Sequence, residues 1–138
     1  MKHLRLKQLL RREEGISLAE LALILPVFLA LLLGMIDLGH GFNTYLGMLN
    51  AAREGSFWLM KEGTDVAGMN NRITVELERV DLTLADMQGA ITIPHKGSYE
   101  PGDIVTVRLD YSYELMFGAI TGLPSLTLSA ENTVKVQP

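Results

Sequence analysis

Cysteine is absent from the 138 residues of this chain. Its absence excludes disulfide cross-links, thiol catalysis and thiolate metal sites together. The sequence also lacks a glycine-rich phosphate loop, a nucleophile elbow and a His/carboxylate set at metal-ligand spacing. Asp37 and His40 would share a helical face, but His3 and His95, which a metal site would also need, lie elsewhere in the chain. We therefore expect no enzyme, cofactor or metal, and interpret Asp37 and His40 as polar residues that end an apolar segment.

Charge is absent from one long stretch, Leu21–Ile36. Together with residues 16–19 it gives about 20 residues, enough to cross a hydrocarbon core of about 30 Å. No Lys or Arg follows until Arg53, whereas basic residues crowd the N-terminus: Lys2, Arg5, Lys7, Arg11 and Arg12. The positive-inside rule then predicts a cytoplasmic N-terminus and an outer domain. Because the basic residues flank a membrane segment, we expect no nucleic-acid partner.

Glu20 lies near the start of this apolar segment, five positions after Gly15. An ionised side chain costs about 2.5–3.5 kcal/mol at mid-membrane, so Glu20 needs headgroups or a positive partner. Gly15 is a candidate processing site, but it precedes the apolar run, whereas a secretory signal is cleaved after its apolar region. Cleavage there would make Ile16 N-terminal, with an α-amine (ordinary pKa about 7.7–8) that is largely protonated at neutral pH. In the uncut chain we expect no fixed partner for Glu20 beyond water or headgroups.

A basic leader, then Gly15, then an apolar segment with Glu20 at its fifth position resembles the class III leader of type IV pilins and pseudopilins. Three stretches resemble the signature of TadE-like proteins, the pseudopilins of tight-adherence (Flp-type) pilus systems, over roughly residues 12–56: Glu20–Pro26, Leu33–His40 and Asn50–Gly55. The sequence departs from that pattern in having Leu21 where an aromatic residue is usual and His40 where Arg is commoner.

The resemblance implies a minor pilin or pseudopilin, cleaved after Gly15 by a prepilin peptidase. Its partners would be other pilin subunits, the inner-membrane assembly platform and the lipid bilayer, and Glu20 would neutralise the new amine and set axial register between subunits. The chain would cross the bacterial inner membrane once, with a periplasmic domain, and could enter an extracellular pilus. The alternative is an unprocessed inner-membrane protein whose outer domain scaffolds or binds secretion or pilus machinery.

Two features of the long helix leave alternatives open. Pro26 cannot donate a hydrogen bond to the carbonyl of Ala22, so it should kink or loosen the helix. It is either simply tolerated in a membrane helix or part of a melted segment that lets subunits pack. Small residues four apart favour close packing, between subunits or within one chain: Ala30 and Gly34 in the span, and Gly47, Ala51 and Gly55 beyond it.

The sequence predicts three parts: a leader (1–15), a long helix (16–62) whose transmembrane half is 16–36, and an outer α+β domain (63–138). An apolar stripe with helical spacing follows the span and should seat that domain: Phe42, Tyr45, Leu46, Leu49, Ala52 and Leu59. A second helix over 66–80, capped by Asp65, comes next, although the alternation of Ile73, Val75 and Leu77 also permits a strand there. A short strand over 90–93 follows.

Alternation predicts the last two strands. Pro101 and Gly102 suit the central positions of a type II turn. The inward residues of the first strand would be Val105, Val107, Leu109, Tyr111, Tyr113 and Leu115, and those of the second Leu126, Leu128, Ala130, Val134 and Val136. Three antiparallel strands with one apolar face need a cover, which the helical stripe offers. The predicted fold is α+β: a long N-terminal transmembrane helix packed on a small antiparallel, pilin-like sheet, with a short second helix.

Overall fold

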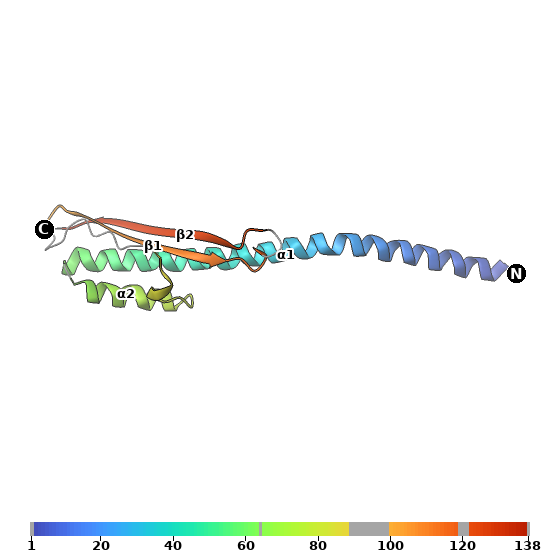
Figure 1. Cartoon of the computed structure of the whole chain (residues 1–138), viewed down its shortest axis with the longest axis horizontal. Coiled ribbons are helices and arrows are strands. Elements are labelled where there is room, and N and C mark those ends of the chain that lie inside the picture. The colour runs from blue at the N-terminus through green and yellow to red at the C-terminus, as the bar shows by residue number, and fades with distance from the viewer. Residues whose placement is uncertain (1, 64, 89–99, 119–121, 138) are drawn as a thin grey trace. The chain divides into compact units, whose positions relative to one another are not determined.

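The computed structural model describes the chain except for residues 1, 64, 89–99, 119–121 and 138, with side chains from residue 16 onward. Its elements are α1 (Lys2–Glu62), α2 (Val66–Glu78), the 3-10 turn η1 (Leu84–Asp86), β1 (Ile104–Glu114) and β2 (Ser125–Lys135) (Figure 1). They form two compact units, residues 1–36 and 37–138. The predicted α+β class is confirmed: a long apolar helix, a short second helix and an antiparallel sheet. The strand predicted over 90–93 lies outside the described residues.

The turn between α1 and α2 is fixed by capping. Gly63 has a left-handed backbone (φ 60°), and its amide donates to the carbonyl of Leu59 at 3.0 Å, which closes the end of α1. Asp65 is the N-cap of α2, as the sequence predicts: its Oδ1 accepts from the amide of Gly68 at 3.0 Å. Its Oδ2 also accepts from the indole of Trp58 at 3.2 Å. One side chain therefore ties the start of α2 to the last turns of α1.

β1 and β2 pair in an antiparallel ladder in which Leu109 lies opposite Ala130. The predicted turn before β1 is confirmed: the amide of Asp103 donates to the carbonyl of Glu100 at 3.0 Å, and Gly102 has φ 105°. Such a φ suits glycine, which has no Cβ to clash.

The core of the second unit is built on the C-terminal half of α1. In Figure 1 the two strands run along one side of this half and α2 runs along the other. All three layers contribute buried apolar side chains: Met48, Ala51, Ala52 and Leu59 from α1, Met69, Ile73 and Leu77 from α2, and Val105, Val107, Leu109 and Ala130 from the sheet. Because α1 lies between α2 and the sheet, it buries side chains on two of its faces and forms the middle layer of the core.

The predicted stripe on α1 is partly wrong for this reason. Leu59 and Ala52 are fully buried as expected, but Phe42 is 64% exposed and Leu46 is 41% exposed. The side of α1 that carries Gly47, Ala51 and Gly55 faces α2, because small residues let that helix approach closely.

The inner face predicted for β2 also needs correction. Leu126 is 53% exposed, whereas Ala130 and Val136 are buried. The alternation between them places a polar residue, Asn132, on the inner face, where its amide donates to the hydroxyl of the fully buried Ser56 at 2.5 Å. This bond gives both polar groups a partner next to the core.

Gly47 offers a direct test of the close approach between α1 and Val80, which follows the end of α2. A Cβ placed on Gly47 would lie 2.6 Å from both Cγ atoms of Val80, whereas one on Gly39 would meet nothing within 4 Å. We expect Gly47→Ala to lower the free energy of unfolding by about 1–3 kcal/mol through overpacking. Gly39→Ala should be neutral or stabilising by up to about 1 kcal/mol, because alanine favours a helix. Denaturant unfolding of the full chain in detergent, followed by Trp58 fluorescence, measures both; equal effects would contradict the packing described.

Candidate functional site

The apolar segment of α1 exposes its side chains. One described helical segment, Ile16–Glu62, is long and apolar enough to cross a membrane, and 6% of its most apolar window is buried. Leu23 and Ile24, for example, are 79% and 61% exposed. The core helix of a soluble domain would be mostly buried, and exposed apolar surface on this scale marks contact with lipid or protein. The segment is consistent with a single-pass membrane anchor.

Gly15, Ile16 and Glu20 lie within the helical part of the chain near the start of this segment. The side chains of Ile16 and Glu20 are both exposed. Among the side chains that the structure describes, none forms a hydrogen bond or ion pair with Glu20. Ile16 and Glu20 are four positions apart on the helix, a rise of about 6 Å, so the two lie about one turn apart on the same face.

The remaining residues singled out on α1 differ in what surrounds them. Pro26 lies inside the helix. Ala30 and Gly34 are partly exposed, and a Cβ built on Gly34 would meet no described atom within 4 Å other than its chain neighbours and the nearby backbone of its own helix. Gly55, by contrast, lies against Ile73 of α2. Gly47, Ala51 and Gly55 therefore pack within the chain, while Ala30 and Gly34 inside the apolar segment have an open surface.

Asp37, the first residue after the apolar run, is 3% exposed. Its Oδ1 accepts from the amide of Met116 at 3.0 Å and its Oδ2 from the amide of Phe117 at 2.9 Å, both just past the end of β1. The phenol of Tyr113 donates to its carbonyl oxygen at 3.4 Å. His40 is exposed and takes no part. Asp37 is thus a buried clasp between α1 and the chain that leaves β1, a role that the sequence did not reveal.

The clasp affects the acidity of a neighbouring phenol. Burial raises the pKa of Tyr113 above its ordinary value, and the nearby negative charge of Asp37 raises this pKa further. Tyr113 lies on the inner face of β1, with its ring 3.6 Å from where a Cβ of Gly41 would be. The neutral phenol is therefore the form that fits the folded unit.

A pH dependence follows from this raised pKa. Because the folded state holds the Tyr113 proton more tightly than the unfolded state, the associated stability is complete below the unfolded pKa of about 10 and is lost as the pH rises through the folded value. We expect the free energy of unfolding to fall above about pH 10, and to fall less in Tyr113→Phe. Denaturant titrations of the full chain in detergent at a series of alkaline pH values measure the slope. Identical slopes for both proteins would contradict the assignment.

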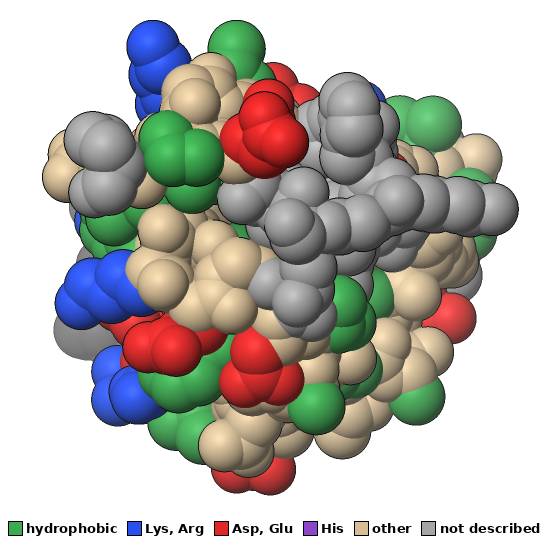
Figure 2. Space-filling view, turned by 90° about the vertical axis from the view of Figure 1, so that its left-hand side faces the viewer, with side chains coloured by type: hydrophobic (Ala, Val, Ile, Leu, Met, Phe, Trp, Pro, Cys, Tyr) green, Lys and Arg blue, Asp and Glu red, His purple; other side chains and the backbone are tan. Residues whose placement is uncertain are grey.

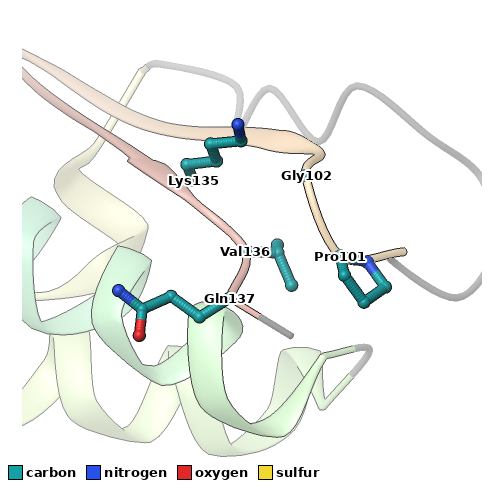
Figure 3. Close-up of a pocket in the computed structure, with 5 residues that line it drawn as sticks. All are labelled: Pro101, Gly102, Lys135, Val136 and Gln137. Carbon is teal, nitrogen blue, oxygen red and sulfur yellow. The ribbon is translucent and has the colours of Figure 1, made fainter.

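The hollows found on the described surface of the second unit are shallow. One of about 410 Å³ lies at the end of the sheet, lined by Pro101, Gly102, Lys135, Val136 and Gln137 (Figure 3). Val136 lies across from Pro101, and the amide of Gly102 donates to the carbonyl of Val136 at 2.9 Å. Within the described residues, no group of three His, Cys, Asp or Glu side chains could hold a metal ion. The candidate site residues that the sequence indicates all lie on α1.

Most of α1 also falls within a stretch that is similar to a known family. Residues 15–56 match the sequence model of a family described as TadE-like protein. These residues are similar to TadE-like proteins. The match begins at Gly15, includes Glu20, Pro26 and Asp37, and ends next to Gly55. No curated protein and no solved structure matches the chain significantly. The match agrees with the resemblance to TadE-like proteins noted in the sequence over roughly residues 12–56.

Proposed function

We propose that this TadE-like chain is a minor pilin or pseudopilin, a structural subunit in the assembly of a tight-adherence pilus. In this proposal a prepilin peptidase cleaves after Gly15, the apolar half of α1 holds the subunit in the bacterial inner membrane, and the second unit lies in the periplasm. The subunit then meets other pilin subunits and the assembly platform, and enters or primes the filament. It performs no catalysis.

The observation that carries the proposal is the juxtaposition of Gly15, Ile16 and Glu20 at the start of an exposed apolar helix. The family match starts at Gly15, so it includes both the proposed cleavage site and the acidic residue. Cleavage would create a positive α-amine on Ile16 one helical turn from Glu20, whose carboxylate has no partner among the described side chains. Opposite charges in a medium of low dielectric attract strongly, so this amine and a Glu20 carboxylate, of the same or a neighbouring subunit, would pair.

The helix surface supports association between subunits. Packing of membrane helices needs small residues where backbones approach. Gly55 already packs against α2 and is not available to another subunit. Ala30 and Gly34, by contrast, lie on the exposed apolar segment, with open space at Gly34. We assign subunit packing to Ala30 and Gly34 and intrachain packing to Gly47, Ala51 and Gly55. Pro26, four residues before Ala30, would let the helix adapt to its neighbours.

Processing provides the test of this function. The protein is purified from its native membranes, from cells with and without the prepilin peptidase, and its intact mass and N-terminal peptide are measured. We expect a mature N-terminus at Ile16 only in cells that contain the peptidase, and uncut protein in Gly15→Leu cells, because a bulky residue replaces the small one at the cleavage site. Gly39→Leu, outside the leader, is the control and should be cleaved normally. An intact leader in wild-type cells would favour the alternative, a permanently anchored scaffold protein.

A further inference from the structure

We propose that the second unit makes its own contact with the membrane surface, through an apolar rim at the end of its sheet. The rim is defined by Met116, Leu123 and Leu126, which lie just after β1, before β2 and near the start of β2. The rim would contact the interfacial layer of the same bilayer that the apolar half of α1 crosses. The inference rests on the membrane anchor alone and does not depend on cleavage or on entry into a pilus.

The rim lies where the chain leaves the apolar run. If residues 16–36 span the hydrocarbon core, a helix of this length covers about 30 Å, so Asp37 lies at its outer boundary. The carboxylate of Asp37 holds the amides of Met116 and Phe117 at 3.0 and 2.9 Å. The rim is therefore attached, by contacts within the second unit, to the residue at which the membrane segment ends.

The side chains of the rim are those expected of a surface in contact with lipid. Met116, Leu123 and Leu126 are 64%, 65% and 53% exposed. On α1, Leu38 and Phe42 follow Asp37 and are 74% and 64% exposed. Apolar side chains left in water at one end of a domain are costly, and burial in the interfacial layer removes that cost.

The charges of this region indicate what kind of membrane contact it is. No Lys or Arg occurs between Arg108 and Lys135, or between the span and Arg53. Asp37, whose carboxylate accepts from the amides of Met116 and Phe117, is buried, and Glu114, the last residue of β1, is exposed. Docking would therefore depend on apolar contact and not on attraction to anionic lipids, in contrast to a polybasic surface. It should be insensitive to salt and to lipid charge.

The end of the molecule that carries the C-terminus has a different character. Figure 2 faces that end, where Lys or Arg and Asp or Glu side chains reach the surface between scattered hydrophobic ones. Ile104 at the start of β1 is nevertheless 58% exposed, about as much as the rim residues, and lies a whole strand away from them. It provides a matched apolar position outside the proposed contact.

Because the chain has no cysteine, single cysteines can report on each position. The full chain carries Met116→Cys, Leu123→Cys, Glu114→Cys or Ile104→Cys, labelled with an environment-sensitive fluorophore and reconstituted in phosphatidylcholine vesicles. Quenching by spin-labelled lipid is compared with quenching by aqueous iodide. Glu114 lies beside the rim on the polar outer face and controls for mere proximity to the bilayer, and Ile104 controls for apolar surroundings. Circular dichroism checks that each variant is folded.

We expect lipid quenching at positions 116 and 123 to exceed that at 114 and 104 several-fold, with the opposite order for iodide. The difference should persist in about 0.5 M salt and on addition of anionic lipid, because screening affects only charge attraction. Equal quenching at 116 and 104 would overturn the proposal. Protection at 116 from both quenchers that grows with the protein-to-lipid ratio would also overturn it, since a second copy of the chain would then cover the rim.

Discussion

Asp37→Ala is expected to lower the free energy of unfolding of the second unit by about 2–4 kcal/mol, because two hydrogen bonds to a charged acceptor are lost. The side chain is 3% exposed, so water cannot easily replace the carboxylate at the amides of Met116 and Phe117. Relief of the cost of burying a charge offsets part of the loss, which keeps the expected effect below the sum of two such bonds. Unfolding by denaturant in detergent, followed by the fluorescence of Trp58, measures it, since this is the chain's one tryptophan.

Two further variants separate the clasp from a general effect of charge. Glu54→Ala removes an exposed carboxylate from the same helix and should change stability by no more than about 0.5 kcal/mol. Asp37→Asn keeps the shape and one acceptor oxygen but turns an amide group toward an N–H donor, so its effect should approach that of alanine. A stability of Asp37→Ala equal to that of Glu54→Ala would show that the clasp contributes nothing. If the clasp holds the rim, Asp37→Ala should also reduce lipid quenching at position 116.

Local patterns explain why much of the fold could be predicted. The alternation in β1 correctly identified Val105, Val107 and Leu109 as buried, because a sheet with one covered face has a strict period of two. Asp65 correctly marked the start of α2, because capping depends on residues only a few positions away. The Gly102 turn was correct for the same reason.

Long-range partners explain what could not be predicted. Asp37 is bound by backbone amides, which every residue except proline carries, so no residue type in the sequence signals the pairing. Asn132 interrupts an apolar alternation, and this indicates only that a buried partner is needed, not that Ser56 provides it. The buried faces of α1 depend on layers on both of its sides, whereas the predicted stripe assumed one.

The candidate site could be predicted from the sequence because its residues are defined by their positions along the chain. Gly15, Ile16 and Glu20 are defined by their order and by their place between a basic leader and an apolar run, and the family match covers all three. Their proposed partners are outside a single uncut chain, which agrees with the exposed Glu20 that the structure describes. The chain alone therefore gives the residues of the site but not its assembled geometry.

Glu20→Gln is expected to leave membrane insertion intact but to abolish support of pilus assembly. Glutamine has nearly the size and shape of glutamate, so the helix and its packing surface remain, and insertion becomes easier because a charged group is removed from the apolar segment. What is lost is the attraction for a protonated N-terminus, which in a medium of low dielectric contributes much more than it would in water. Cell fractionation measures insertion, and electron microscopy or shearing of surface filaments measures piliation in cells whose own copy is deleted.

The controls distinguish charge pairing from other roles of the same residue. Glu62→Gln removes a carboxylate from the exposed end of α1, outside the family match, and should support pili normally. Mass spectrometry of Glu20→Gln should show the N-terminus at Ile16, because the scissile Gly15 is unchanged; an uncut chain would move the role of Glu20 from assembly to cleavage. Glu20→Asp keeps the charge on a shorter side chain and should retain part of the activity. Normal piliation by Glu20→Gln would contradict the pairing, since only the negative charge distinguishes this variant from the wild type.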